Sequence, residues 1–375
     1  MQLSETVKLY PTQEQNVLLE KTMRGYIQTV NSLVSVAVSG ISIKDYTSAD
    51  VEADLPSALK NQCIRDAKSI VRKHYKECRK AVLKNRSLAK KHSGIRVTAP
   101  ALPVLRKPCC YINNQNFRVT ETGIEFPVMV NGKSKRICVM TKITGRQKNL
   151  FADASFGTMR IVVKNSRIVA QIVYEAAEPE VPAEGNVMGI DLGIKCPAVS
   201  YCSDGKIKFY GNGRKNKYMR RQYAYLRKKL QSSKKMKAVK RINDKEQRIM
   251  RDIDHKISHD IVKEAAAHNV KVIKLEQLQN VRSATRTSRK NNHSLHTWSF
   301  YRLAQFIEYK AKLAGIFVEY VNPAYTSQRC PVCGNIHHAS DRHYTCECGY
   351  RQHRDVVGAI NICSSTEVVG NRLSA

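Results

Sequence analysis

The chain has 375 residues, of which 64 are Lys or Arg and 31 are Asp or Glu, so its formal net charge is +33. This length suggests two or three domains, each able to bury a core. The positive charge indicates a polyanionic partner, nucleic acid before a membrane surface, and does not by itself separate enzymes from structural binders. No run approaches the ~20 apolar residues of a membrane span, and no signal-peptide core opens the chain. We therefore expect a cytoplasmic protein whose 12 cysteines are free or bound to metal.

The N-terminal part predicts one strand followed by two long helices. Residues 3–10 read as the strand. Thr12 and Gln15 then form a capping box, which starts a helix that runs to about Val38. A second, very basic helix is expected from Ser57 to about residue 91. Its expected apolar stripe consists of Ile64, Ile70, Val71, Tyr75 and Cys78.

Residues 100–183 predict a β domain. Asn131-Gly132 between two β-branched runs is a strong hairpin signal, and a second hairpin is expected to turn at residues 164–167. We expect a small barrel or sandwich that the first strand joins, which makes the helices at 13–95 an insertion. The adjacent pair Cys109-Cys110 reads as two small apolar residues in a strand.

The C-terminal part follows an acidic, proline-containing linker at 175–184 and predicts an α/β domain. Its expected elements are strands at 186–191, 198–202 and 206–210, a basic helical stretch at 215–269, a strand at 270–276, a helix at 300–314, a strand at 317–321 and a last helix from 356.

Three acidic residues stand where strands or helices of this domain end or begin. Asp191 ends one apolar strand, Glu276 ends another, and Asp355 opens the last helix. Open α/β sheets place their sites at the carboxyl ends of strands, and a helix N-terminus favours an ionised carboxylate. Adjacent strands would bring Asp191 and Glu276 together. Helix capping and ordinary surface charge are the alternative interpretations.

Clustered carboxylates repel one another, so such a site requires cations. Hard oxygen ligands select Mg²⁺ or Mn²⁺. Two such ions can clamp a scissile phosphate, one at the attacking oxygen and one at the leaving oxygen. The pattern therefore predicts a metal-dependent phosphodiester hydrolase.

Four cysteines near the C-terminus form two knuckles, each followed by glycine: Cys330, Cys333, Cys346 and Cys348. Four thiolates at this spacing are typical of a tetrahedral Zn²⁺ site. A closed four-cysteine shell leaves no position for water, so the predicted zinc is structural. In contrast, His255 and His259 lack the glutamate of a zincin helix and are expected to be structural or to contact phosphate.

Basic residues cluster in two places that we expect to contact nucleic acid phosphates. One is the start of the basic helical stretch; the other is a polar loop after Glu276. The residues are Arg214, Lys215, Arg220, Arg221, Arg286, Arg289 and Lys290. The alternative is a solvated surface. The single tryptophan, Trp298, follows the loop and is expected to anchor the core.

At these motifs the sequence resembles the TnpB family, the RNA-guided nucleases of bacterial and archaeal insertion sequences, and their relatives among the compact type V CRISPR effectors. GIDLGI at 189–194 resembles the first RuvC motif and LEQL at 275–278 the second. The cysteine knuckles and then RDVVGAINI at 354–362 resemble the zinc ribbon and the third motif. The similarity is dense over 186–362 and looser before it.

The resemblance implies a multidomain α/β protein. A β-barrel wedge domain at 1–12 and 96–183 would carry a helical recognition domain at 13–95. An RNase H-like (RuvC) nuclease domain at 184–375 would follow, with a zinc ribbon at about 325–350. Asp191, Glu276 and Asp355 match the catalytic acids that hold two Mg²⁺, and the four cysteines match the ligands of one Zn²⁺. His353 and Val357 depart from the Asp and Asn that the family often has there.

The implied function is RNA-guided DNA cleavage by a prokaryotic, nucleoid-associated protein. A guide RNA from the transposon end would pair with target double-stranded DNA beside a short flanking motif, and no membrane or obligate protein partner is expected. Three alternatives remain: a compact CRISPR effector, a nuclease-dead repressor, which the three acids argue against, and a transposase, for which we find no separate catalytic set.

Overall fold

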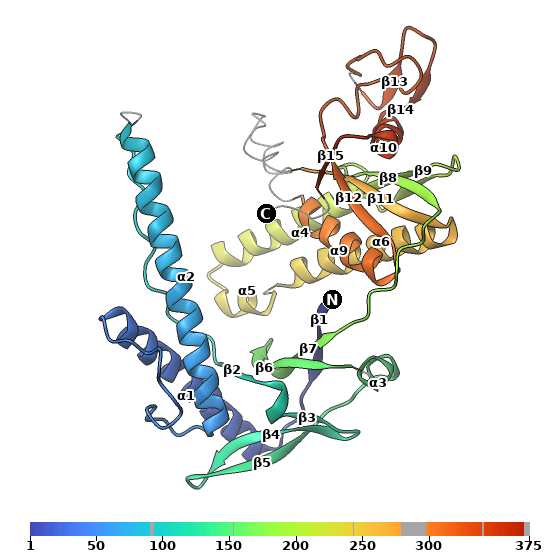
Figure 1. The fold of residues 1–375 in the computed structure, drawn as a ribbon. Coiled ribbons are helices and arrows are strands. Elements are labelled where there is room, and N and C mark those ends of the chain that lie inside the picture. The colour runs from blue at the N-terminus through green and yellow to red at the C-terminus, as the bar shows by residue number, and fades with distance from the viewer. Residues whose placement is uncertain (91–93, 153, 243, 279–297, 340, 371–375) are drawn as a thin grey trace. The chain divides into compact units, whose positions relative to one another are not determined.

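The computed structural model describes residues 1–90, 94–152, 154–242, 244–278, 298–339 and 341–370 (Figure 1). The chain divides into two compact units, Met1–Ala176 and Ala177–Ala375, and each has its own hydrophobic core. The division falls at the start of the acidic linker that the sequence predicts. Among the described residues, no helix combines the length and apolar character needed to cross a membrane.

The strands of the first unit lie in two sheets. A four-stranded sheet has the order β1-β7-β6-β2, and a three-stranded sheet has the order β3-β4-β5. Both predicted hairpins are confirmed, with left-handed backbone at Asn131 and Gly132 in one turn and at Asn165 and Ser166 in the other. The strands are β1 (Gln2–Lys8), β2 (Cys109–Ile112), β3 (Arg118–Val119), β4 (Gly123–Val130), β5 (Lys133–Met140), β6 (Phe156–Lys164) and β7 (Arg167–Glu175).

The predicted first strand does join this β structure, since β1 pairs antiparallel with β7. Cys109 and Cys110 are buried in β2, as expected. Two short helices complete the unit: η1 (Asn114–Asn116) and α3 (Gly145–Ala152).

Two long helices pack on each other in the first unit, α1 (Gln13–Val38) and α2 (Ser57–Lys90). The capping box at Thr12 and Gln15 is present in both directions. The expected apolar stripe of α2 is only partly right, because Tyr75 is 52% exposed. Packing occupies mainly the first half of α2, and the rest of this helix extends beyond α1 (Figure 1).

The second unit is built on a six-stranded sheet with the order β10-β9-β8-β11-β12-β15. The three central strands β8, β11 and β12 are parallel, and the other pairs are antiparallel. The bounds are β8 (Asn186–Asp191), β9 (Ala198–Cys202), β10 (Ile207–Tyr210), β11 (Val270–Glu276), β12 (Phe317–Val321) and β15 (Val368–Gly370). The edge strand β15 is not predicted from the sequence.

The predicted basic helical stretch at 215–269 is helical and consists of three helices, α4 (Gly213–Ser232), α5 (Met236–Ile242) and α6 (Lys245–Ala267). The other helices in the described part of this unit are α9 (Phe300–Leu313) and α10 (Arg354–Ser364). The first break follows the C-cap Ser233, where Lys234 takes a left-handed conformation (φ 54°). A run of charges with no clear apolar period hides this break in the sequence.

Helices cover both faces of the six-stranded sheet. Met188 and Ile190 of β8 join the core formed with α6 and α9. Gly189 points to the opposite face, since successive residues of a strand alternate. There α10 lies so close that a Cβ at position 189 would stand 2.2 Å from the carbonyl oxygen of Ala359. Only glycine permits this approach of helix to strand.

The two strands of a small antiparallel sheet flank the second predicted cysteine knuckle, and the second strand runs into α10. The sheet consists of β13 (His343–Thr345) and β14 (Arg351–His353). Tyr344 is fully buried in its small core with Cys330 and Cys346. Since β14 leads directly into α10, the cysteine cluster is covalently continuous with the helix that carries Asp355.

Candidate active site and zinc-binding cluster

The fold brings the three predicted acids to one face of the second unit's sheet. Strands β8 and β11 are parallel neighbours, with Ile190 opposite Leu275, so Asp191 and Glu276 end adjacent strands at the same edge. Ile190 and Leu275 face the α6–α9 core, so the acids that follow them face α10. Asp355 lies in the first turn of that helix.

Asp191 lies directly against α10. A Cβ at Gly358, one turn after Asp355, would stand 3.2 Å from the Asp191 Oδ2 atom. Burial, followed by the negative charges of Glu276 and Asp355, raises the pKa of Asp191 well above its ordinary value, although Arg342 and Arg354 oppose this. The three acids therefore interact electrostatically, and the ionised form of Asp191 is costly without a cation nearby.

The other two acids are each held by a side chain that the sequence analysis did not identify. Glu276 accepts a short hydrogen bond from the Thr326 hydroxyl, while burial raises the pKa of Glu276. Asp355, 6% exposed, forms a short ion pair with Arg342, and its backbone N–H donates to Nδ1 of His353. Asn361 of α10 in turn donates to the carbonyl oxygen of Thr326 at 2.7 Å.

The donor set suits a hard divalent cation, because it consists of carboxylate oxygens and the charges of Glu276 and Asp355 raise the cost of ionising Asp191. With Thr326 on Glu276 and Arg342 on Asp355, however, the three carboxylates do not converge as a ready metal site. In the described parts of the chain, only the four cysteines bring three or more His, Cys, Asp or Glu ligand atoms within 4.8 Å of one another.

The four predicted cysteines do converge. Their Sγ atoms all lie within 4.8 Å, with Cys330 to Cys348 at 3.6 Å and Cys333 to Cys346 at 3.5 Å. Tetrahedral Zn²⁺ with bonds of about 2.3 Å separates its sulfurs by about 3.8 Å, close to these values. The cluster can hold a metal ion.

Backbone hydrogen-bond donors favour the thiolate form of Cys330. Burial alone would raise the pKa of Cys330, but backbone hydrogen bonds from Cys333 and Val332 lower it to about 7. Against a backbone donor at Asn335, the side-chain hydrogen bond with Cys346 instead raises the pKa of Cys333. Against a backbone donor at Tyr350, burial raises the pKa of Cys348. The thiolate is the form that binds metal. The glycines after each knuckle, Gly334 and Gly349, have φ of 78° and 88°, the left-handed region that a tight turn requires.

The predicted phosphate-contacting residues lie in different surroundings. Arg214, Lys215 and Arg221 are exposed on α4. Arg220 is half-buried and faces the acidic side chains of Glu246 and Asp254. The remaining three, Arg286, Arg289 and Lys290, lie outside the described residues.

The predictions for the two histidines and the single tryptophan agree with the structure where it describes these residues. The ring of His255 stacks on Phe306 at 3.9 Å, which is a structural role, and His259 is exposed. Trp298 packs against the core of the second unit, as expected, but stays partly exposed and lines a cavity. Its sequence position carried no signal for the cavity, because the other walls come from α4 and from the loop after β8.

Two family models match the second unit and the end of β7. Residues 171–282 match the model described as a probable transposase of the OrfB_IS605 type, and residues 300–362 match the Cas12f1-like TNB domain. A TnpB-like protein of Methanocaldococcus jannaschii is 40% identical over 152 residues, which cover 39% of this chain and 54% of the relative.

A second relative is the CRISPR-associated endodeoxyribonuclease Cas12f1 of Sulfoacidibacillus thermotolerans. It is 35% identical over 133 residues, 34% of this chain and 30% of the relative. The chain thus spans about half or less of the length of these curated relatives.

Among solved structures, a Cas12f1–sgRNA–target DNA complex contains a similar fold. Its TM-score is 0.63 at 17% identity, over 94% of this chain and 82% of that one. This likeness extends over both units. Together, the comparisons confirm the resemblance to the TnpB family and its compact Cas12f relatives that the motifs predict.

Proposed function

We propose that this chain is an RNA-guided DNA endonuclease whose cutting site consists of Asp191, Glu276 and Asp355. The observation that carries the proposal is the placement of these acids: two end adjacent parallel strands, and the third opens the helix packed on that edge. The names of the two relatives, a TnpB-like protein and an endodeoxyribonuclease, support the same activity.

The sheet order supports an RNase H-like (RuvC) assignment for the second unit. Strands β8, β9 and β10 form an antiparallel meander, and β11 and β12 then add in parallel on the other side of β8. Asp191 therefore ends the central strand β8. The long connection through α4 to α6 then returns the chain as β11, which lies beside β8. We assign the two sheets of the first unit to a wedge domain and α1 and α2 to an inserted recognition domain.

Asp191, Glu276 and Asp355 would hold two Mg²⁺ or Mn²⁺ ions, which when bound would activate the attacking water and stabilise the leaving oxygen. Asp355 is buried and Asp191 is partly buried, which limits the screening of their charges by bulk water. The protein would position these ligands by rigid means: Gly189 and Gly358 let α10 approach β8, and Thr326 orients Glu276. Arg342 would have to leave Asp355 for that carboxylate to join them.

The cysteine cluster would hold one structural Zn²⁺. Its role would be to fix the start of α10, since β14 runs directly into that helix. The four sulfurs would complete the tetrahedral shell, so the cluster would take no part in the cutting chemistry.

The net charge of +33 supports the RNA and DNA partners. Guide pairing would supply the sequence specificity, and the protein would supply phosphate-binding surface. Many phosphate contacts also imply that binding weakens by orders of magnitude as salt rises.

The test is to purify the full chain, sequence the RNA that copurifies with it, and reprogram that RNA toward a chosen plasmid sequence. We expect Mg²⁺-dependent cutting at the programmed site, no cutting after RNase treatment, and none by the matched variant Glu276→Gln. Sequence-specific cutting by RNA-free protein would contradict the guide, and wild-type cutting by Glu276→Gln would contradict the site.

A further inference from the structure

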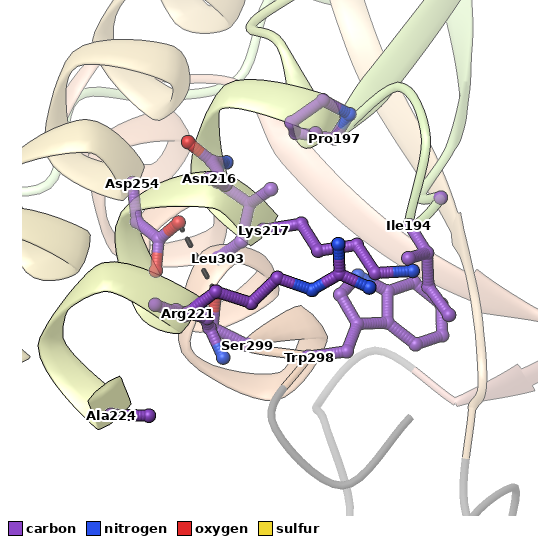
Figure 2. Close-up of a pocket in the computed structure, with 13 residues that line it drawn as sticks. Ile194, Pro197, Asn216, Lys217, Arg221, Ala224, Asp254, Trp298, Ser299 and Leu303 are labelled. Atoms are coloured by element: carbon purple, nitrogen blue, oxygen red, sulfur yellow. Dashed lines mark hydrogen bonds between the residues drawn. The ribbon is translucent and has the colours of Figure 1, made fainter. Parts of the chain in front are cut away.

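A cavity of about 200 Å³ lies in the second unit beside the strand end that carries Asp191 (Figure 2). Its walls come from four places: the loop that follows β8, the first turns of α4, Asp254 of α6 and the start of α9. Pockets for drug-sized ligands span roughly 300–1,000 Å³, so this one suits a single ring system with its substituents.

The cavity combines apolar walls with a cationic rim. Ile194, Leu303 and the indole of Trp298 supply apolar surface. From α4, the side chains of Lys217 and Arg221 reach toward Trp298 (Figure 2). An aromatic face beside two cations is the arrangement that binds an unstacked nucleotide, because the base stacks on the ring and the phosphate meets the cations.

The floor of the cavity is a fixed polar network. Asp254, 4% exposed, accepts a hydrogen bond at 2.7 Å from Nε of Arg302 and one at 3.3 Å from the hydroxyl of Ser299. Ser299 directly follows Trp298, so the network anchors the chain beside the indole. Arg220 faces this floor, where the charges of Asp254 and Glu246 attract its guanidinium. We therefore assign a ligand's phosphate to Lys217 and Arg221.

The cavity stands next to the proposed cutting site. Gly193, in its wall, comes two residues after Asp191, and two residues of extended chain span at most about 7 Å. Nucleotides in a stacked strand follow one another at about 3.4 Å. A strand with one phosphate at the acids therefore places a neighbouring nucleotide within reach of the cavity.

We propose that this cavity holds one unstacked nucleotide of the DNA strand that is cut, with its base against Trp298 and its phosphate between Lys217 and Arg221. The pocket then sets which phosphate reaches the acids. The proposal rests on the proposed function for its substrate, but the pocket and the acids can be tested separately.

Trp298 is the only tryptophan of the chain, so its fluorescence reports on this cavity alone. The full-length protein is titrated with a single-stranded oligodeoxynucleotide without added divalent cation, and in parallel with the matching oligoribonucleotide. We expect saturable quenching by the DNA strand. No quenching by either strand, or quenching by RNA only, overturns the proposal.

Variants then separate stacking from charge, with a labelled oligodeoxynucleotide as the probe. Trp298→Leu keeps an apolar side chain but removes the ring, and should weaken binding roughly 5- to 150-fold, whereas Trp298→Phe should retain most of it. Removing Lys217 and Arg221 together should lower the slope of log affinity against log salt by about 0.7 per lost phosphate contact. The control is Lys228→Ala with Lys229→Ala, which removes equal charge from α4 outside the cavity.

The cutting position provides the final readout. Under the proposal, Trp298→Leu shifts or blurs the cut by one or more nucleotides, while the melting temperature of the protein stays near that of Trp298→Phe. If binding, salt slope and cut position all stay at wild-type values while Glu276→Gln abolishes cutting, the endonuclease proposal stands and the pocket proposal fails. If neither the wild-type protein nor any variant cuts DNA but the DNA strand still quenches Trp298, the pocket proposal stands and the endonuclease proposal fails.

Discussion

The four cysteines and the three carboxylates are two candidate ligand sets assembled in different ways. The cysteines come from one short segment, and their sulfurs already converge. The carboxylates come from three separate segments, and each is held by other protein groups: Asp191 against α10, Glu276 by Thr326 and Asp355 by Arg342. Local spacing is enough to build the first set, whereas the second depends on strand order and on one close helix–strand contact.

The two sets also differ in how the protein treats their charge. Backbone donors lower the pKa of Cys330 and favour its ionised form. Burial and neighbouring acids raise the pKa of Asp191 and disfavour its ionised form. The thiolate of Cys330 is therefore favoured by its surroundings, whereas Asp191 carries a stability cost that a functional site can justify.

Asp191→Asn gives the largest expected effect and tests that cost. Cutting should fall below detection, because a neutral amide is a poor ligand for a divalent cation. The melting temperature should rise, because the substitution removes a carboxyl group whose ionisation is disfavoured by burial and by the charges of Glu276 and Asp355. Plasmid cleavage and thermal unfolding at neutral pH measure the two effects.

The control for this prediction is Asp252→Asn, which removes an exposed acid paired with Lys256. It should change cutting and melting little. A fall in the melting temperature of Asp191→Asn would contradict the stability cost at the carboxylates.

Removal of zinc is expected to have the next largest effect. Elemental analysis should find one zinc per chain, and chelation or Cys330→Ser should unfold the β13–β14 hairpin, because few apolar residues support it. Cutting should then fall as well, since α10 and Asp355 continue from β14. Cys138→Ser, an exposed cysteine outside the cluster, is the matched control. Freshly purified, folded protein without zinc would be incompatible with a structural cluster.

Gly189→Ala should disturb the carboxylates and spare the cysteines. The added methyl would meet backbone atoms of Ala359 and Cys363 at 2.2 and 2.4 Å, which can yield only if α10 moves away from β8. We expect a loss of about 1–3 kcal/mol or more in unfolding free energy and a larger fall in cutting than in zinc content. Gly145→Ala, with open space around its Cβ, is the control.

Periodicity and turn chemistry predicted the elements that position both sites. The apolar run Val270–Glu276 is β11 with the same bounds, and the turn residues Asn131-Gly132 join β4 to β5. The strands β13 and β15 were not predicted, because three residues are too short for an alternation to emerge. In α4 to α6, lysines and arginines conceal the breaks between helices.

The composition of each site was more predictable than its contacts. Strand ends and knuckle spacing predicted seven ligand candidates, of which the four cysteines converge as a metal site in the structure. Thr326 and Arg342 carried no signal, since a single threonine or arginine in a loop has no period and finds its partner only through the fold. The cavity beside Trp298 could not be predicted from the sequence for the same reason, because its walls come from segments far apart in the chain.

The smallest expected effect concerns the helical layer behind the carboxylate-bearing sheet. His255 of α6 stacks on Phe306 of α9. Burial, then the positive charges of Lys310 and Arg251, lower the pKa of His255 to about 4, although Asp252 opposes this. In the unfolded chain His255 binds a proton near pH 6.5, and in the folded chain it does not. The stability gained by burying the neutral His255 ring is therefore complete above pH 6.5 and is lost as the pH falls toward 4.

His255→Phe keeps a stacked ring and removes the titration. It should therefore flatten the fall in unfolding free energy between pH 6.5 and 4, measured by denaturant unfolding across that range, while His259→Gln at an exposed position should leave the fall unchanged. Solvent screens the partly exposed ring, so the difference between the curves should be small. The zinc cluster is not part of this layer, so the difference should persist in Cys330→Ser. If the wild-type and His255→Phe curves coincide over the whole range, His255 is protonated in the folded protein, and the α6–α9 layer tolerates its charge.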